Sequence, residues 1–107
     1  NKKYLFTGDM EEKEEMDLIN KYKKELDSDI LKVGHHGSNT SSSINFLDYV
    51  SPTYSIISVG ENNKYNLPDI EIVNRLKKFG IVYQTNLCGN ITIIQKNNYF
   101  NIKTYKN

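Results

Sequence analysis

The run of residues 54–59, YSIISV, constrains the fold most, because every residue in it is apolar, aromatic or a small serine. A strand with one face in water alternates polar and apolar side chains, whereas a continuous run is typical of a strand buried on both faces. The run therefore predicts a strand in the interior of a sheet.

Helical patterns occur on both sides of this strand. Residues 11–26 begin with acidic side chains and end with lysines, an order that suits the helix dipole and predicts an amphipathic helix. A serine at position 41, 42 or 43 can cap a short helix that ends at Ser51-Pro52. Pro68 and Gly80 bracket a third helix.

The first of these helices is predicted to bury one apolar side against the sheet. Its apolar residues at helical spacing are Met16, Ile19, Tyr22 and Leu26. Its acidic run is predicted to be a solvated face and consists of Glu11, Glu12, Glu14 and Glu15. The two sets together predict which side of the helix meets the core.

Short β-rich runs at residues 3–7, 30–33 and 81–85 alternate with these helices. Two further runs, NITIIQ and YFNIKTY, are joined by the sequence KNN at residues 96–98, and asparagine tolerates the positive φ of a hairpin turn. The order is strand then helix about three times, followed by an antiparallel pair. It predicts an α/β fold, with a mixed sheet covered by helices on one face and a closing β-hairpin.

The composition is that of a globular domain. A chain of 107 residues, with 37% hydrophobic and 25% charged residues, has room for one compact core. No apolar run approaches the roughly 20 residues that a membrane helix needs. The 14 basic and 13 acidic residues leave a net charge of +1, too small to imply nucleic-acid or membrane binding by charge alone. The single cysteine, Cys88, cannot form an internal disulfide and so indicates no redox compartment.

The first residues are typical of the interior of a longer sequence. The opening Asn1-Lys2-Lys3 contains no initiator methionine and no signal-peptide hydrophobic stretch, and a strand pattern is already under way at Tyr4. We therefore expect residues 1–107 to be one partial domain of a larger protein.

The first candidate functional residue is Asp9, in the sequence Thr7-Gly8-Asp9. It follows a predicted strand, and the loops at the ends of strands carry the sites of α/β proteins. A structural role is equally open, because Asp9 with Glu12 three residues later resembles a helix cap with its reciprocal glutamate. The residues alone leave both roles open.

The two histidines of the chain, His35 and His36, stand side by side between Gly34 and Gly37. A histidine at the end of a buried strand can be a metal ligand, a general acid or base, or an ordinary hydrogen-bonded residue. On an extended backbone two adjacent side chains point in different directions, so one could bind a metal ion while the other meets a substrate. Flanking glycines allow a ligand to approach the backbone closely, and they are also common in plain turns.

Hydroxyl and amide groups form the third candidate. The stretch SNTSSS follows the histidines, and a polar loop with the sequence ENNKY occupies residues 61–65. Such groups can hold phosphate oxygens. Serines before a helix are more often caps, however, and an asparagine-rich loop is more often only a loop.

The order of these motifs is more specific than any one of them. LFTGD is followed by a helix, LKVGHHGS, the buried SIISVG strand, NKY, a proline-started helix and a hairpin. This order resembles the C-terminal half of the metallo-β-lactamase fold, in particular the hydrolase domain of ComEC-type DNA-internalisation competence proteins and related phosphodiesterases. The resemblance extends from about residue 3 to about residue 95. It implies that residues 1–107 are the C-terminal half of an αββα sandwich.

The resemblance implies a role for each candidate. The aspartate of the family's TGD motif bridges two divalent metal ions, which points to Asp9. A histidine of its HHGS motif is a further ligand, which points to His36, with His35 facing the substrate; the pair is implied more strongly than this order. The ions would be Zn²⁺ or Mn²⁺, and a water activated between them would attack a phosphodiester, with Asp9 and His35 as catalytic residues. The implied holders of the phosphate are Ser38, Thr40 and Asn63.

The chain departs from the family in two places. The HxHxDH motif that supplies most ligands lies in the N-terminal half of the fold and has no counterpart here. A catalytic zinc needs about three protein ligands, so we expect the isolated chain to be metal-free and inactive, with the missing half as its partner and with self-association through the exposed sheet. Where the family has Tyr-Gly-His-Pro, this chain has Tyr65-Asn66-Leu67-Pro68, which replaces an imidazole by an alkyl group.

The implied function is that of a fragment of a metal-dependent phosphodiesterase or nuclease of bacterial DNA uptake, in a parent that would be associated with the membrane. The alternative is a catalytically inactive binding or structural module that kept the scaffold and lost its site, which Leu67 and the missing ligands would explain. A lactonase or thioesterase on the same fold is a third candidate, since a fold does not fix the substrate.

Overall fold

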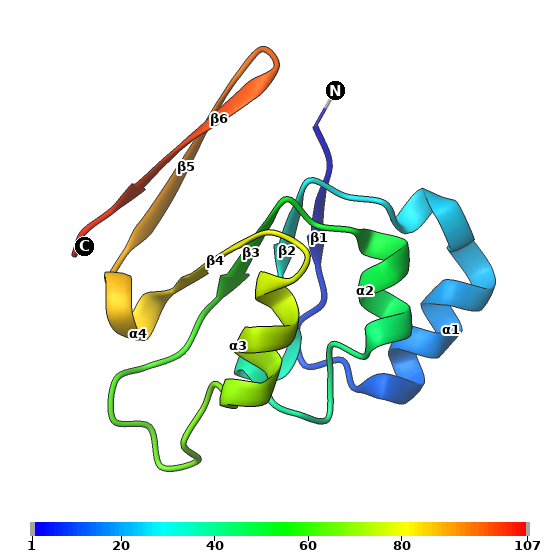
Figure 1. Ribbon diagram of the computed structural model, residues 1–107, viewed down its shortest axis with the longest axis horizontal. Helices are drawn as coiled ribbons and strands as arrows, with labels where there is room; N and C mark the ends of the chain where they lie inside the picture. The colour runs from blue at the N-terminus through cyan, green and yellow to red at the C-terminus, as the bar shows by residue number, and fades with distance from the viewer. Residues whose placement is uncertain (1, 107) are drawn as a thin grey trace.

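The computed structural model describes residues 2–106 and contains a four-stranded sheet in which all strands are parallel (Figure 1). Its strands, in their order across the sheet, are β1 (Tyr4–Phe6), β2 (Ile30–Lys32), β3 (Tyr54–Ile57) and β4 (Ile81–Gln84). In β3, Ser55, Ile56 and Ile57 are all buried, which confirms the prediction of an interior strand.

Helices connect consecutive strands. They are α1 (Glu12–Tyr22) with the 3-10 turn η1 (Lys23–Leu26), the 3-10 segment η2 (Gly34–Gly37), α2 (Ile44–Val50), α3 (Ile70–Lys77) and α4 (Thr85–Cys88). The three predicted helices are present, although the third begins two residues after Pro68. Ser43 caps α2, with its Oγ accepting a hydrogen bond from the Phe46 amide at 3.2 Å. None of the helices within residues 2–106 is both long and apolar enough to cross a membrane.

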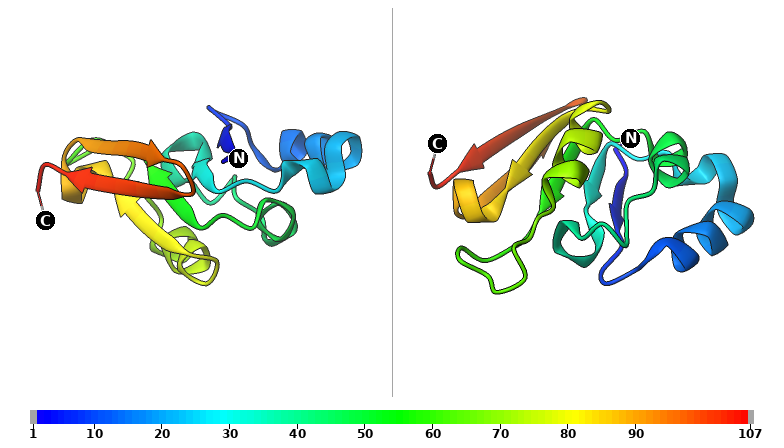
Figure 2. Two further views of the ribbon diagram at one scale, coloured as in Figure 1. Left: turned by 90° about the horizontal axis from the view of Figure 1, so that it is seen from above. Right: turned by 60° about the horizontal axis from the view of Figure 1, so that its bottom comes forward.

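The two faces of the sheet meet different partners (Figure 2). One face packs on the helices, because Leu31 belongs to the same core cluster as buried helical residues, and Leu5 and Val82, which occupy the same register across the sheet, pack against that cluster. Those helical residues are Ile19, Phe46, Leu47, Val50, Ile72, Val73 and Leu76. The prediction that helices cover one face of the sheet is therefore confirmed.

A hairpin of β5 (Ile91–Lys96) and β6 (Tyr99–Thr104) lies over the other face. Its Phe100 ring meets the ring of Tyr4 at 5.8 Å and that of Tyr54 at 5.9 Å, nearly edge-on in both cases, and the Tyr4 hydroxyl donates to Gln95 Oε1 at 3.0 Å. The predicted hairpin is confirmed. It forms a sheet of its own over the parallel strands, so the single mixed sheet expected from the sequence is not formed.

The start of α1 differs from the prediction. The N-cap is Glu11, whose backbone amide donates to the Glu14 carboxylate at 3.0 Å, so the capping pair is Glu11 with Glu14 and does not include Asp9. Of the predicted apolar side, Met16 and Tyr22 are each 40% exposed. Glu15, predicted to be solvated, is 1% exposed. The buried side of α1 is therefore turned toward Glu15 and Ile19.

The hydroxyl of Ser55 is a local defect in the core. The side chain is 1% exposed, and its Oγ has no hydrogen-bond partner among residues 2–106. Because burial of an unpaired hydroxyl is costly, Ser55→Ala is expected to raise the free energy of unfolding by about 1 kcal/mol, measured by urea denaturation. Ser28→Ala is the matched comparison, since the buried Ser28 Oγ donates to the Leu26 carbonyl at 2.8 Å and its removal should destabilise. Equal losses in the two variants would contradict this account.

Candidate functional site

The candidate site lies where the parallel strands end. Because all four strands run in the same direction, their carboxyl ends meet at one edge of the sheet, the place where α/β proteins bind ligands. Asp9 follows β1, the two histidines follow β2, Ser58 follows β3 and Thr85 follows β4. The sheet therefore gathers residues that are up to 76 positions apart in the sequence, 85 minus 9.

The loops after β1 and β2 are in direct contact. Thr7 Oγ1 donates to the Lys32 carbonyl at 2.9 Å, and the His35 amide donates to the Gly8 carbonyl at 2.8 Å. A Cβ at Gly34 would lie 3.0 Å from Thr7 Oγ1 and 3.2 Å from the Met10 carbonyl. Glycine at position 34 therefore allows the loop that carries Asp9 to pack against the loop that carries the histidines.

Asp9 is exposed and takes no part in capping α1. Thr7 before it is buried, and a hydrogen bond from the Met10 amide to the Thr7 carbonyl, 3.1 Å long, closes the turn around Asp9. Within residues 2–106 no group donates a hydrogen bond to its carboxylate. The structural role that the sequence left open for Asp9 is thus filled by Glu11 and Glu14, and both carboxylate oxygens of Asp9 are available to a ligand.

The two histidines adopt a backbone that the sequence did not predict. His35 has φ 51° and ψ 40°, and His36 has φ 53° and ψ 29°, so both lie in the left-handed region and not on the extended backbone expected. Non-glycine residues rarely adopt this conformation, because Cβ approaches the carbonyl oxygen too closely. The segment makes a tight turn that directs the two rings to different neighbours.

His36 is held by the end of β3. Its Nδ1 lies 2.6 Å from the Ser58 carbonyl oxygen, and because a carbonyl only accepts, Nδ1 must carry the proton. In the neutral ring Nε2 then has its lone pair free. A histidine that donates one ring N–H to a backbone carbonyl is oriented and polarised for metal binding through the other nitrogen.

The His35 ring turns toward the hydroxyl loop. It is half-buried, and its Nδ1 lies 3.4 Å from Thr40 Oγ1. Thr40 Oγ1 also lies 3.0 Å from Ser38 Oγ. The three side chains form a short polar chain beside the Asp9 turn, since the Thr40 carbonyl accepts from the Glu12 amide at 2.9 Å.

Of the three predicted phosphate holders, Thr40 is exposed whereas Ser38 is buried. Ser38 Oγ accepts from the Thr40 amide at 3.3 Å, a local turn contact. The Asn63 amide donates to the carbonyls of Gly60 at 3.1 Å and Leu67 at 2.7 Å, and its Oδ1 accepts from the Leu67 amide at 2.8 Å. Asn63 thus braces its own loop, and its role at a phosphate stays a prediction.

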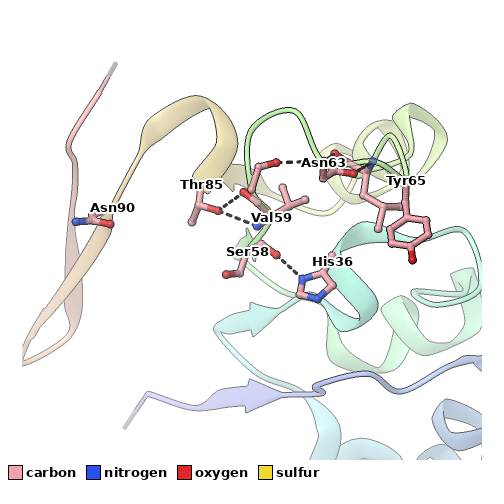
Figure 3. Close-up of a pocket in the computed structure, with 9 residues that line it drawn as sticks. His36, Ser58, Val59, Asn63, Tyr65, Thr85 and Asn90 are labelled. Carbon is pink, nitrogen blue, oxygen red and sulfur yellow. Dashed lines mark hydrogen bonds between the residues drawn. The ribbon is translucent and has the colours of Figure 1, made fainter.

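A cavity of about 600 Å³ opens next to His36 (Figure 3). The residues that line it are His36, Ser58, Val59, Gly60, Asn63, Tyr65, Leu67, Thr85 and Asn90. Thr85 Oγ1 donates to the Val59 carbonyl at 2.9 Å and accepts from its amide at 2.8 Å, which joins the ends of β3 and β4 at the back of the cavity. Sequence reasoning missed Ser58, Thr85 and Asn90, because only the folded chain brings them to the cavity that His36 lines.

The wall of the cavity is tied to the histidine turn. The Asp69 amide donates to the Gly37 carbonyl at 3.0 Å, and the Asn39 amide donates to Asp69 Oδ2 at 2.7 Å. Gly37 has φ +81°, and a Cβ there would lie 2.5 Å from Pro68 Cβ. The segment that carries Leu67 is therefore packed directly against the segment that carries His36.

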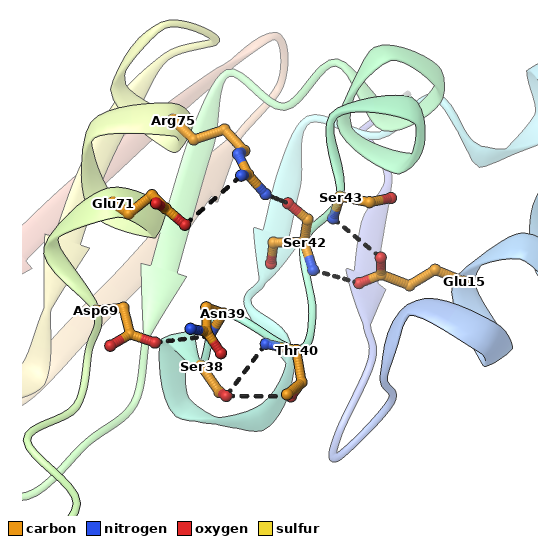
Figure 4. Close-up of polar contacts among 9 residues, drawn as sticks. All are labelled: Glu15, Ser38, Asn39, Thr40, Ser42, Ser43, Asp69, Glu71 and Arg75. Atoms are coloured by element: carbon orange, nitrogen blue, oxygen red, sulfur yellow. Dashed lines mark hydrogen bonds and ion pairs between the residues drawn. The ribbon is translucent and has the colours of Figure 1, made fainter.

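A buried carboxylate fixes the loop that follows the histidines (Figure 4). Glu15 accepts from the amides of Ser42 at 2.5 Å and Ser43 at 3.0 Å, and Arg75 Nη1 donates to the Ser42 carbonyl at 2.9 Å. Ser42 itself has a positive φ of 58°. Glu15 was predicted to be solvated; it instead binds α1 to the start of α2.

One ion pair lies on the loop of residues 60–67, which borders the cavity. Lys106 Nζ is 2.6 Å from Glu61 Oε1, and this hydrogen bond and charge lower the pKa of the Glu61 carboxyl below its usual value. Both side chains are exposed, so the pair contributes little to stability. It neutralises Lys106, whereas within residues 2–106 Lys64 on the same loop makes no ion pair.

The chemistry of Asp9 and His36 fits a divalent metal ion, but the described chain does not complete a site. An accessible carboxylate and an imidazole with a free Nε2 are suitable ligands for zinc or manganese. Within residues 2–106 no three His, Cys, Asp or Glu side chains lie close enough together to hold an ion. Any metal centre built on this edge therefore needs ligands in addition to those described.

Comparison with known proteins finds several chains that are similar to this one. Competence protein ComA of Neisseria gonorrhoeae is 46% identical over 86 residues, which are 79% of this chain and 12% of that protein. ComE operon protein 3 of Bacillus subtilis (strain 168) is 34% identical over 103 residues, 95% of this chain and 13% of that protein. Recombination protein 2 of Haemophilus influenzae is 37% identical over 90 residues, 83% of this chain and 11% of that protein.

These relatives support a competence-related family. No family model matches the chain, and no solved structure matches it. The chain spans only 11% to 13% of the length of the three relatives. The similarity therefore concerns one segment of much longer proteins.

Proposed function

We propose that this chain is part of a metal-dependent hydrolase that cleaves phosphodiesters, with DNA as the substrate, in a competence protein of bacteria. The observation that carries the proposal is the His36 ring, whose Nδ1–H donates to the Ser58 carbonyl at 2.6 Å and leaves Nε2 free at the mouth of a cavity. The exposed Asp9 carboxylate, on a loop packed against the histidine turn, supports it. The similarity to Competence protein ComA and ComE operon protein 3 supports the assignment to competence, in which bacteria take up DNA.

In this proposal Asp9 and His36 would contribute ligands to a pair of divalent ions, Zn²⁺ or Mn²⁺. Ions bound there would supply Lewis acidity toward the phosphate and lower the pKa of a water. His35 would meet the substrate, and its contact with Thr40 Oγ1 at 3.4 Å orients the ring. Ser38 Oγ lies 3.0 Å from Thr40 Oγ1 and so helps to position the Thr40 side chain. Thr40 and Asn63 lie on the two loops that would flank the phosphate.

The remaining ligands would come from a preceding half of the same domain, which together with this chain would form the αββα sandwich of the metallo-β-lactamase fold. Phe6 on β1 supports a further packing partner, because 73% of its surface is exposed on the strand at the edge of the sheet. An apolar cavity of about 140 Å³ adjoins it, lined by residues of β1, β2, β3 and β5. In the isolated chain the same surface would favour self-association.

The test uses the longer protein in which this chain is joined to its preceding segment. We expect cleavage of bis(p-nitrophenyl) phosphate that is lost with a chelator and restored by Zn²⁺ or Mn²⁺. Calorimetric titration with zinc should show tight binding that releases protons, because metal ligands must be deprotonated. Hydrolysis that is indifferent to the chelator would contradict the proposal.

A second candidate is a catalytically inactive binding module on the same scaffold. Leu67 favours it, because an alkyl side chain that can neither ligate nor donate lines the cavity beside His36. The two candidates differ in the zinc titration of the longer protein, since an inactive scaffold should bind no zinc tightly. A panel of lactone and thioester substrates would test the remaining hydrolase chemistries on the same protein.

A further inference from the structure

Tyr65 is a large aromatic side chain exposed beside the candidate site. It is 70% exposed, and yet it lines the same cavity as His36 (Figure 3). The Lys64 ammonium lies 5.3 Å from the centroid of its ring, a cation–π contact. A tyrosine offers an apolar ring face together with a polar hydroxyl, which suits it to binding surfaces.

The loop that presents Tyr65 is preorganised. The Asn63 amide bonds to the backbone at Gly60 and Leu67, on both sides of the tyrosine, and the Asn66 amide donates to the Asn63 carbonyl at 3.3 Å. The end of the loop is joined to the histidine turn through Gly37 and Asp69. The backbone that carries the ring is therefore held relative to His36, which lowers the entropy lost when a flat ligand stacks on the ring.

We propose that Tyr65 is a stacking platform for one base of single-stranded DNA. The proposal rests on the phosphodiester substrate proposed above and adds the residue that binds its base. Bases stack on exposed aromatic rings in a sequence-tolerant way, and a nearby cation attracts the phosphate backbone. Lys64 makes no ion pair within residues 2–106, unlike Lys106. The charge of Lys64 is therefore available to the phosphates of the DNA.

The rest of the cavity suits a nucleotide. Val59 and Leu67 provide apolar wall, whereas Thr85 and Asn90 provide polar groups beyond it. A volume of about 600 Å³ lies in the range of small-molecule sites. With its base on Tyr65, a nucleotide would fill this cavity and bring its phosphate to the side where His36 lies. Duplex DNA would not fit this mode, because its bases are already stacked and paired.

The test separates stacking from phosphate binding and from hydrolysis. Fluorescein-labelled dT10 and an abasic decamer with the same phosphates are titrated with the chain by anisotropy, in EDTA so that no cleavage intervenes. Tyr65→Ala is expected to weaken dT10 binding about tenfold and to leave the abasic decamer unchanged, whereas Tyr65→Phe should bind as the unsubstituted chain. Tyr99→Ala is the control, since Tyr99 is 59% exposed on the hairpin and does not line the cavity.

Three results would overturn the proposal: no binding of dT10 by the chain, equal affinity for dT10 and the abasic decamer, or no effect of Tyr65→Ala on dT10. Circular dichroism verifies that the variant is folded, which the exposed position of Tyr65 favours. Because binding is measured without metal, base stacking on Tyr65 can hold even where phosphodiester hydrolysis by the longer protein fails. Conversely, an active hydrolase that binds the abasic decamer equally well would refute only the stacking role.

Discussion

In the longer protein, Asp9→Ala combined with His36→Ala is expected to reduce phosphodiester hydrolysis by at least about a hundredfold. The two substitutions remove the accessible carboxylate after β1 and the imidazole whose Nε2 is free after β2. The two loops then lack the carboxylate and the imidazole proposed to hold the ions that would activate the attacking water. The measurement is kcat/KM for bis(p-nitrophenyl) phosphate, with the zinc content of each variant determined in parallel.

Asp17→Ala is the matched control for this experiment. Asp17 is an exposed carboxylate on α1, so its removal changes the charge of the protein without touching the candidate site. Activity and zinc content of this variant should equal those of the unsubstituted protein. Hydrolysis that survives the loss of both Asp9 and His36 would show that these residues do not form the catalytic centre.

Substitution of Glu15 is expected to have the largest effect on stability. Glu15→Ala should lower the free energy of unfolding by about 3 kcal/mol, because it leaves the Ser42 and Ser43 amides without the carboxylate that accepts from them. Glu15→Gln should cost about 2 kcal/mol, since one oxygen still accepts while the new NH₂ group faces an N–H donor. Both values are measured by urea denaturation.

Asp17→Asn makes the same chemical change on the exposed side of α1 and should shift stability by no more than about 0.5 kcal/mol. A loss in Glu15→Gln no greater than in this control would show that the buried carboxylate is dispensable. Ser42 and Thr40 belong to the same loop. The Glu15 variants should therefore also loosen the contact between Thr40 and the His35 ring. Line broadening of the His35 ring resonances by NMR would report that loosening.

The strands and helices could be predicted from the sequence because their signals are local. The run at residues 54–59 contains only apolar, aromatic or serine residues, Ser43 precedes a helix, and asparagines stand at the hairpin turn. The placement of the hairpin could not be predicted, because it depends on Phe100 finding Tyr4 and Tyr54 across the sheet. Such contacts join residues that are distant in sequence and leave no local pattern.

The position of the candidate residues at the ends of strands could be predicted from the sequence, whereas their backbone geometry could not, and their functional roles stay predictions. Asp9, His35 and His36 were singled out as strand-end residues, and the parallel sheet brings their loops together. Glu15 was misassigned because charge was taken as a sign of solvent, although its spacing of four residues from Ile19 places both on one side of α1. Ser58, Thr85 and Asn90 carry no signal of their own, since Ser58 meets His36 through the pairing of β2 with β3, Thr85 meets Val59 through the pairing of β3 with β4, and Asn90 reaches the cavity only after α4.

The left-handed backbone of His35 and His36 bears on the choice between an enzyme and an inactive module. Each of the two conformations costs roughly 1–2 kcal/mol for a residue with a Cβ, and glycine or asparagine would adopt them at lower cost. A scaffold selected for shape alone would gain stability by giving up both imidazoles. Glycine at either position should therefore stabilise the fold, while it removes a ring on which the proposed hydrolase would depend and an inactive module would not.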